Sequence, residues 1–412
     1  MRRVRILLGV AGILLLSLGT AACVFDSSTC KCSLSSSASK FAYVIGSSDS
    51  IAAFTITSGA GTLVPVSGSP FGAGGTPMFG AADPAGKFLY VADPGTQHIF
   101  AFNIDQTTGA LTAVTGSPFS VDSGELITAR MPVVDPTGGF LYVTDFDSCG
   151  DGCFGAISAF KIGADGSLTA VAGSPFATKY GALGIAVHPT GGFVYAVDSN
   201  SGVISGFKMD STSGVLTEIS GSPFSVGEIR VSFAAVHPSG KFLYATGTLG
   251  TGTNGFVFGY SIDPTSGALT EINLGSNRTG MNPQGIDVDG IDNFLFVANE
   301  ASSSPTGATS GSISVYQIDA IAGTLTQVVG SPFATTGNNP FQLAVDRSCK
   351  FLYVTNSDGG RGSAFDYALG FTIDPLSGNL TAVAGSPFST SSSGPPGGIV
   401  LTPHLAAIGT GP

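Results

Sequence analysis

The sequence is poor in charge, histidine and tryptophan, and these scarcities exclude several classes of protein. Charged residues make up 10% of the 412 residues, there are only 4 histidines, and tryptophan is absent. A disordered chain would carry more charge and fewer apolar residues than the 43% found here. A helical bundle would not tolerate 60 glycines. What remains is a chain of short strands joined by many turns.

Long hydrophobic runs and basic residues are also scarce. A single apolar run approaches the roughly 20 residues of a membrane-spanning helix, at the N-terminus, which excludes a polytopic membrane protein. Lys and Arg number 16 against 27 Asp and Glu, giving a net charge of −11. Because an acidic surface repels phosphate backbones, we expect no nucleic-acid partner.

Residues 1–22 have the organisation of an export signal. Three arginines in the first five residues precede the apolar segment Ile6–Leu18, and Thr20–Ala22 lead to Cys23. Small residues before a cysteine are typical of bacterial lipoproteins, in which that cysteine is acylated. We therefore predict a lipid anchor at Cys23. The alternative is an ordinary secretory signal, cleaved near Ala22.

The segment 23–39 is rich in serine and suits a flexible tether between lipid and domain. Exported chains can hold disulfides. Cys149 and Cys153 flank a Gly-rich stretch, and a disulfide between them would close a small loop. Six cysteines with one lipidated leave an odd thiol, so the sequence does not determine the pairing.

An internal repeat of roughly 50 residues decides the fold. Its clearest mark is the tetrapeptide Gly-Ser-Pro-Phe, which begins at Gly68, Gly116, Gly173, Gly221, Gly330 and Gly385. A degenerate copy, Gly275-Ser276-Asn277-Arg278, fills the one gap. Seven units of this length predict the blades of a β-propeller, each with four strands.

Each unit carries further signals in a fixed order. A short apolar run ends in a turn such as His188-Pro189-Thr190-Gly191, and a strand rich in β-formers follows, as at Lys87–Ala92. The third strand has an aromatic residue at one place in every unit: Phe54, Phe102, Phe160, Phe207, Tyr260, Tyr316 and Phe371. We interpret these aromatics as packing between neighbouring sheets. Gly-Ser-Pro-Phe is expected to close the fourth strand, where proline stops further pairing.

The two ends of the repeat complement each other. The first unit begins at its second strand, Phe41–Ile45, while the chain ends in a segment, Gly398–Pro403, that aligns with the first strand at Gly184–Pro189. We therefore predict an all-β, seven-bladed propeller of four-stranded antiparallel blades, closed by the C-terminal strand joining blade one. It forms one domain over residues 40–405, followed by a tail at 406–412.

The segment Phe351–Asn356, Phe-Leu-Tyr-Val-Thr-Asn, and the order of the blade signals resemble the lactonase-type seven-bladed propellers. That group includes the 6-phosphogluconolactonase-like proteins, the carboxymuconate cyclases and the YVTN-repeat surface proteins. The resemblance implies the fold and, for the enzymatic members, hydrolysis of a lactone. Asn299-Glu300 matches a family motif, whereas the family's Pro-Arg-His is replaced by Pro283-Gln284-Gly285. Glu300 is thus the one site residue that the resemblance carries over.

In a propeller, the loops into the first strands and the loops from second to third strands share one face around the channel. Candidate side chains in or beside those loops are Glu125, Arg130, Lys179, Tyr180, Glu228, Arg230, Arg278, Gln284, Asn339, Glu300, Arg361 and Asp366. Opening a lactone needs a base that activates water and a cation that stabilises the oxyanion. For a lactonase we expect Glu300 as the base and Arg230 or Arg278 as the cation. The alternative is that these are solvated loop charges.

Metal-binding patterns are weak. The histidines are not clustered, so no zinc site is expected. Asp145, Asp147 and Asp151 lie close together in a Gly-containing loop, which would suit calcium, but Cys149 stands at the fifth position of an EF-hand spacing. We predict no metal and no cofactor, with calcium as the alternative.

Two functions follow from these observations. The first is a monomeric, exported lipoprotein of the cell envelope, attached to the membrane only by its lipid. Its propeller would act as a scaffold that binds a small molecule, a glycan or an envelope protein at the channel face. The second is a secreted lactone hydrolase. A hydrolase predicts carboxylate and arginine side chains converging on the channel mouth, whereas a scaffold predicts Ser, Thr, Asn and aromatic residues there.

Overall fold

A computed structural model describes residues 40–121, 127–147, 155–179, 181–199, 201–227, 229–249, 254–290, 293–300, 311–337, 339–346, 348–357, 367–390 and 396–402. Within these residues, every regular element is a β-strand. None of the described segments forms a helix with the length and apolar character needed to cross a bilayer.

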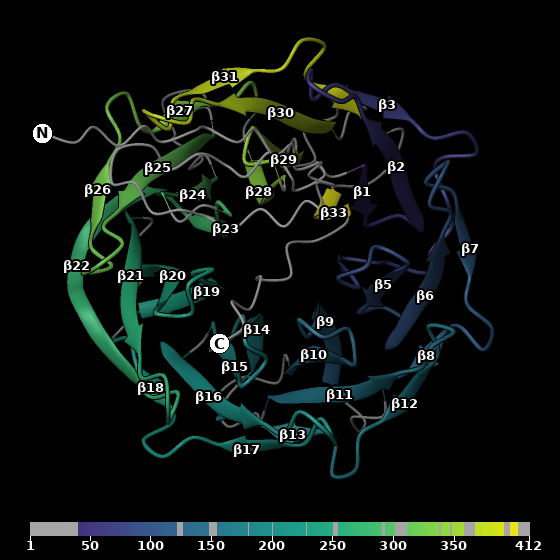
Figure 1. Cartoon of the computed structure of the whole chain (residues 1–412), viewed down its shortest axis with the longest axis horizontal. Coiled ribbons are helices and arrows are strands. Elements are labelled where there is room, and N and C mark those ends of the chain that lie inside the picture. Colours follow the sequence, from purple (N-terminus) through teal and green to yellow (C-terminus); the bar gives the residue numbers. More distant parts are fainter. Residues whose placement is uncertain are drawn as a thin grey trace, which may run out of the picture.

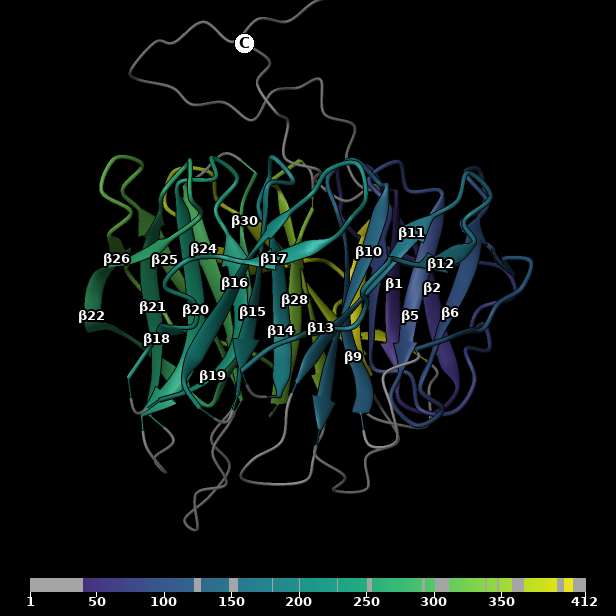
Figure 2. The same cartoon turned by 90° about the horizontal axis from the view of Figure 1, so that it is seen from below.

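The strands form seven antiparallel sheets arranged as blades around a central axis (Figure 1). In each blade the first strand lies innermost, where it contacts the first strands of both neighbouring blades, and the fourth lies at the rim. Figure 2 shows the blades side by side, with their strands crossing the thickness of the ring. The prediction of a seven-bladed, all-β propeller is confirmed.

The strand bounds follow the repeat. The first strands are β33 (Pro396–Thr402), β4 (Phe79–Ala82), β9 (Ile127–Val134), β14 (Ala182–Val187), β19 (Ile229–Val236), β23 (Pro283–Val288) and β28 (Asn339–Val345). The second strands are β1 (Phe41–Gly46), β5 (Phe88–Asp93), β10 (Phe140–Asp147), β15 (Phe193–Asp198), β20 (Phe242–Leu249), β24 (Phe294–Asn299) and β29 (Phe351–Ser357). The third strands are β2 (Ser50–Ile56), β6 (His98–Ile104), β11 (Ala156–Ile162), β16 (Val203–Met209), β21 (Asn254–Ile262), β25 (Ser312–Ile318) and β30 (Tyr367–Ile373). The fourth strands are β3 (Leu63–Pro65), β7 (Leu111–Ala113), β12 (Leu168–Ala170), β17 (Leu216–Glu218), β22 (Leu269–Met281), β26 (Leu325–Gln327) and β31 (Leu380–Ala382).

Blade one is completed by the C-terminal strand, as predicted. Strand β33 pairs antiparallel with β1, and Phe41 lies opposite Thr402. The backbone N–H of Lys40 extends this pairing with a 2.6 Å bond to the Thr402 carbonyl. The chain therefore joins its two ends within one sheet, and the ring has no open blade.

The Gly-Ser-Pro-Phe segments do more than end the fourth strand. In five blades the phenylalanine starts a two-residue strand that turns back and pairs with the third strand: β8 (Phe119–Ser120), β13 (Phe176–Ala177), β18 (Phe224–Ser225), β27 (Phe333–Ala334) and β32 (Phe388–Ser389). In blade one, Phe71 instead bridges to Ile51. The expectation that proline stops pairing was therefore incomplete, because the chain resumes pairing one residue later.

The serine of this segment satisfies the backbone of the third strand. In all six copies its Oγ accepts a backbone N–H at 2.9–3.1 Å, with the pairs Ala53–Ser69, Ala101–Ser117, Ala159–Ser174, Gly206–Ser222, Val315–Ser331 and Gly370–Ser386. The motif is therefore structural. In blade five, which lacks it, the fourth strand β22 runs on for 13 residues beside β21.

The third-strand aromatics are buried between blades, which confirms their interpretation as core residues. Each is at most 8% exposed. Between the blades lie separate clusters of buried apolar side chains, one of which joins Phe54 of blade one to Phe351 and Tyr353 of blade seven. Burial of this kind contributes roughly 25 cal/mol per Å² of apolar surface.

A second contact locks each blade to the next. The phenylalanine that opens each second strand packs on a glycine in the third-to-fourth-strand turn of the following blade, so that an added Cβ would lie closer than 3.0 Å to the ring. The pairs are Phe41–Gly109, Phe88–Gly166, Phe140–Gly214, Phe193–Gly267, Phe242–Gly323, Phe294–Gly378 and Phe351–Gly61. These glycines have φ between 70° and 83°, which disfavours other residues as well.

The tyrosine two residues further on hydrogen-bonds to the same glycine. Its hydroxyl donates to the glycine carbonyl at 2.7–3.1 Å, with the pairs Tyr43–Gly109, Tyr90–Gly166, Tyr142–Gly214, Tyr195–Gly267, Tyr244–Gly323 and Tyr353–Gly61. Blade six has Phe296 at this place and makes the contact without the hydroxyl. Each blade is thus held to the next by one ring and, in six cases, one buried hydrogen bond.

A comparison of two glycines separates the energetic cost of crowding the ring from the cost of the left-handed backbone conformation. Gly109 has φ +77°, and a Cβ there would lie 2.5 Å from the Phe41 ring, whereas Gly59 has φ +79° and nothing within 4 Å. We expect Gly59→Ala to cost about 1–2 kcal/mol, from the left-handed conformation alone. Gly109→Ala should cost about 1–3 kcal/mol more, because Phe41 must move. Chemical unfolding of both variants measures the difference, and equal losses would show that the ring contact is loose.

Candidate functional site

The two faces of the ring carry different chemistry. On one face, the turns between first and second strands are closed by their own side chains. Asp135 accepts the backbone N–H groups of Thr137 (3.0 Å) and Phe140 (2.7 Å). His188 donates through Nε2 to the Gly240 carbonyl of the next blade at 2.9 Å, and burial lowers its pKa. These residues are structural, as their repeated position indicated.

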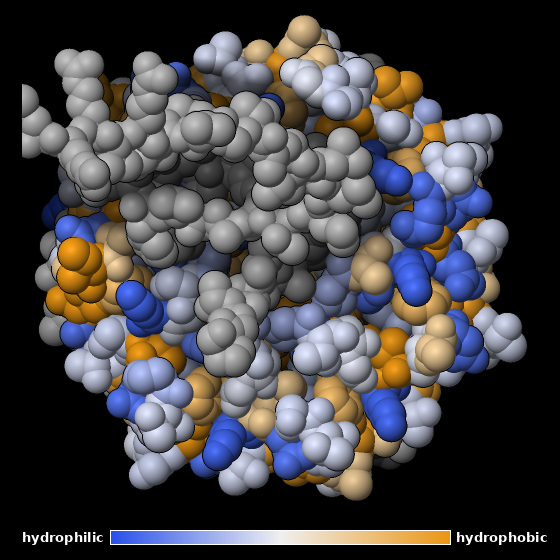
Figure 3. Space-filling view, in the orientation of Figure 1, coloured by the Kyte–Doolittle hydropathy of each residue, from blue (hydrophilic) through white to orange (hydrophobic). Residues whose placement is uncertain are grey.

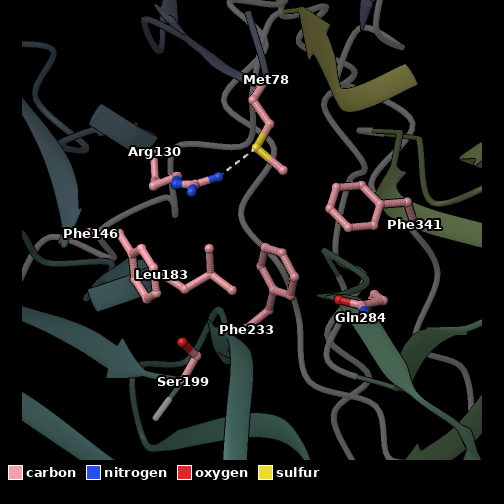
Figure 4. A pocket seen from close by; sticks show the side chains of 8 residues that line it. All are labelled: Met78, Arg130, Phe146, Leu183, Ser199, Phe233, Gln284 and Phe341. Atoms are coloured by element: carbon pink, nitrogen blue, oxygen red, sulfur yellow. Dashed lines mark hydrogen bonds between the residues drawn. The ribbon is translucent and has the colours of Figure 1, made fainter. Parts of the chain in front are cut away.

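A cavity of about 230 Å³ opens at the other face, where first strands begin and second strands end. Pockets for drug-sized ligands measure roughly 300–1,000 Å³, so this one suits a smaller molecule. We call it the mouth cavity, and Figure 4 shows its lining residues, which are Met78, Arg130, Phe146, Leu183, Ser199, Phe233, Gln284 and Phe341.

Three aromatic rings from separate blades meet beside the cavity. Phe233 of β19 and Phe341 of β28 contact edge to face at 6.1 Å between centroids. Buried Phe79 of β4 packs against Phe233 at 5.8 Å and against Phe341 at 5.7 Å. Because these strands come from different sides of the ring, their rings meet across the channel at this level. The mouth cavity therefore has an aromatic wall of fixed position.

Arg130 is the charged residue in the described part of the lining. Its guanidinium lies 5.3 Å from the centre of the Phe146 ring, and Nη1 donates to the sulfur of Met78 at 3.3 Å. A thioether is a weak acceptor. Nε is buried and has no hydrogen-bond partner within the described structure. Burial lowers the pKa of the guanidinium, although arginine stays charged at any physiological pH.

Gln284 connects the cavity to Glu300. Burial raises the pKa of the Glu300 carboxyl group, and a hydrogen bond with the Gln284 side chain partly offsets that rise. An ionised carboxylate only accepts hydrogen bonds, so Gln284 gives its amide nitrogen to Glu300. Its amide oxygen is then left for the cavity, as Figure 4 shows.

Buried threonines fix the strands that carry the lining. Thr144 Oγ1 donates to the Leu183 carbonyl at 3.0 Å, and Thr246 Oγ1 donates to the Gln284 carbonyl at 2.9 Å. Each bond runs from a second strand to the first strand of the next blade. The backbone of the mouth cavity is therefore positioned by contacts between blades and not by loops alone.

The structure does not bring the three predicted catalytic residues together. Glu300 reaches the cavity through Gln284 but is not part of its lining. Arg230 is an exposed residue near the start of β19, outside the lining. Arg278 lies on β22, the outermost strand of blade five, with its guanidinium 5.8 Å from the Phe256 ring centre. A Glu–Arg pair of the expected kind is thus not formed among the described residues.

The other sequence candidates divide into three groups. Arg130 and Gln284 line the mouth cavity, whereas Lys179 is exposed away from the lining and Asn339 begins β28. Glu125, Tyr180, Glu228, Arg361 and Asp366 lie outside the described residues. So do the lipidation site Cys23, both cysteines of the Cys149–Cys153 pair, and the segments 1–22, 23–39 and 406–412.

Sequence reasoning missed the apolar lining. Met78, Leu183, Phe233 and Phe341 belong to first strands or their approaches and look like ordinary core residues. The usable signal was their place in the repeat, since residues near the start of a first strand face the channel. The mouth combines aromatic and aliphatic walls with one arginine. The described lining has the aromatic residues and one of the small polar residues expected of a scaffold, but also aliphatic side chains that were not expected, and it does not form the carboxylate–arginine cluster expected of a hydrolase.

No group of three metal-ligating side chains occurs within the part of the chain that the structure describes. Of the residues considered for calcium, Asp151 and the side chain of Asp147 lie outside that part, and Asp145 is buried. Its Oδ2 accepts from Ser158 Oγ at 2.6 Å, and its Oδ1 has no partner in the described structure. Burial raises the pKa of Asp145 to about 7, although the bonds from Ser158 oppose the rise.

Comparison with known proteins supports the fold. The family model described as lactonase, 7-bladed beta-propeller, matches residues 34–128. The periplasmic gluconolactonase of Pseudomonas aeruginosa is similar, with a TM-score of 0.67 at 16% identity over 89% of this chain and 99% of that one. A candidate 6-phosphogluconolactonase from Bacteroides uniformis gives a TM-score of 0.68 at 16% identity over 88% and 98%. No curated protein sequence matches the chain. The resemblance to lactonase-type propellers is thereby confirmed.

The pKa of Asp145 predicts a pH-dependent stability. An unfolded aspartate titrates near 3.9, so between about pH 4 and 7 the folded chain holds a proton that the unfolded chain releases. Asp145 therefore lowers stability as pH rises through that window, by up to about 1.4 kcal/mol per pH unit.

The variant Asp145→Asn should remove this slope and be more stable than the parent above pH 7. The chain offers a precedent, because Asn299 occupies the same place in blade six and donates to Ser314 Oγ at 3.0 Å. Unfolding free energies at pH 5 and pH 8 test this, and an unchanged slope in the variant would contradict it.

Proposed function

We propose that the protein is an exported, lipid-anchored binding protein whose propeller takes up a small molecule in the mouth cavity. The observation that carries this proposal is the lining itself: apolar walls with a few polar groups, in a concave site at the channel. Small-molecule sites in proteins have this composition. The rigid blades and the interblade threonine bonds would hold the site in shape before a ligand arrives.

The rim of the ring favours a small ligand over a protein partner. Large apolar side chains that are well exposed among the described residues number only four, namely Val64, Ile321, Val329 and Leu376. On the face shown in Figure 3, hydrophobic and hydrophilic residues alternate around the rim. Stable protein interfaces need a contiguous patch of at least about 1,000 Å² in total.

The location proposed here rests on the N-terminal sequence. Basic residues, the short apolar segment Ile6–Leu18 and small residues before Cys23 favour export and lipid attachment. Such an anchor would leave the propeller outside the cytoplasm, where it meets nutrients and metabolites but few phosphorylated intermediates. Mass spectrometry of the processed N-terminus tests this part, since acyl chains on Cys23 are expected.

Filling the cavity tests the binding proposal. Leu183→Trp should occupy the mouth without changing charge, and Leu376→Trp is the matched control, because Leu376 is 90% exposed on an outer turn. We expect calorimetric titration with benzamide, a small flat neutral probe, to show binding to the parent and the control. Binding to Leu183→Trp should be weaker by about tenfold or more. No binding to the parent, or equal binding to all three proteins, would refute the proposal.

Lactone hydrolysis is the second candidate, because one carboxyl group has the properties of a general base. Glu300 has a raised pKa and reaches the cavity through Gln284. Bases with pKa values near the working pH are the most effective. The fold similarity to a periplasmic gluconolactonase agrees with such a role. Among the residues that the structure describes, no second charged group lies beside Glu300.

Glu300→Gln separates the two functions. If the protein hydrolyses glucono-δ-lactone above the spontaneous rate, the variant should lose about 10²–10⁴-fold, the usual contribution of a general base. The parent rate should fall as pH falls through a midpoint above the ordinary glutamate value of about 4.3, since only the ionised group accepts a proton. Benzamide binding should persist in the variant. Hydrolysis unchanged by the substitution would exclude Glu300 as the base.

A further inference from the structure

We propose that the ligand of the mouth cavity is a small, flat carboxylic acid whose carboxylate pairs with Arg130. This inference rests on the proposed binding function and adds the ligand's chemical class. It follows from three features: the unused hydrogen-bonding capacity of Arg130, the shortage of other charge in the cavity, and the apolar character of the remaining walls.

Most of the hydrogen-bond donors of Arg130 have no acceptor within the described structure. A guanidinium carries five N–H groups, of which the structure uses one on the weak acceptor Met78 sulfur. Nε is buried without a partner within the described structure, and one face of the group is covered by Phe146. A buried donor left unpaired is costly, so an acceptor that enters the cavity gains from pairing with it.

The charge of Arg130 is also uncompensated by the cavity. Its other polar members, Ser199 and Gln284, are neutral, and Glu300 is engaged with Gln284 at the edge. No carboxylate pairs with Arg130 among the residues that the structure describes. A half-buried cation in apolar surroundings attracts an anion more strongly than an exposed one does, because less water screens it.

A carboxylate fits this site better than a phosphate. The planar fork of a single arginine matches the two oxygens of one carboxylate. Phosphate sites usually gather several donors, such as lysines or a row of backbone N–H groups, and the described part of the lining offers one cation. The net charge of −11 further disfavours a doubly charged anion.

The body of the ligand is defined by the opposite walls. Phe233 and Phe341 form a rigid aromatic surface facing Arg130 across the cavity, and Leu183 lies between them and Phe146 (Figure 4). Such walls stack on flat apolar rings and offer nothing to the hydroxyls of a sugar. The oxygen of Gln284 and the hydroxyl of Ser199 leave room for one additional polar substituent.

Benzoate and benzamide form an isosteric pair that isolates the charge. We expect benzoate to bind the parent about tenfold or more tightly than benzamide, the gain typical of a charge-assisted hydrogen bond. Arg130→Gln should erase this preference while benzamide still binds. Arg230→Gln is the matched control, since it removes an exposed arginine from the same face, and it should keep the preference. Inorganic phosphate and glucose 6-phosphate are expected not to compete.

The comparison on the parent protein needs no variant, so a folding defect in Arg130→Gln cannot hide the answer. Equal binding of benzoate and benzamide, both lost in Leu183→Trp, would overturn this inference and leave the binding function standing. Competition by phosphate at the same site would also overturn it. Absence of binding by either probe would remove both the inference and the proposed function.

Discussion

The contact on which the molecule depends is that of a phenylalanine ring and a tyrosine hydroxyl with one glycine of the next blade. It recurs at all seven junctions as a ring on a glycine, and at six of them as a buried hydrogen bond. A blade alone is a small sheet with two apolar faces and could not stay folded in water. The contact makes each blade the support of the next, so stability is a property of the ring.

The same dependence places the site. Phe351 and Tyr353 of blade seven close on Gly61 of blade one, while β33 completes the sheet of that blade. With the ring closed, the first strands are held at fixed separations. At three junctions, a threonine of a second strand then donates a hydrogen bond to the first strand of the next blade. Arg130 and the rings of Phe233 and Phe341 therefore face one another because of contacts made far from the channel.

The main recurring features of the fold could be predicted from the sequence, whereas most of the cavity lining, which occurs once, could not, Arg130 and Gln284 being the exceptions. The blade count, the closure by the last strand and the burial of the third-strand aromatics followed from spacing, because a structural role repeats with its unit. The mouth cavity breaks that pattern. Phe233 and Phe341 look like core residues in a strand, and only the closed ring shows that they meet Phe79 across the channel. The predicted position of Arg278, at the channel face, was also wrong. Without the proline of the usual motif, β22 continues outward and carries it to the rim.

Because charged residues are scarce in this chain, the arginine in the described cavity lining stands out. Most of the described acidic residues have a structural role in turns that recur from blade to blade. Asp105, Asp210 and Asp263 each accept backbone N–H groups of their own turn, which lowers their pKa values. Asp135 and Asp346 close turns on the face away from the cavity. Among the described residues, much of the acidic excess therefore arises from the many turns. Arg130 has no counterpart in the other blades, and among the described residues its guanidinium contacts the Phe146 ring and the Met78 sulfur but no carboxylate. Arg130 is thus a half-buried cation beside a concave site at the channel, without the turn-closing role that the described acidic residues have.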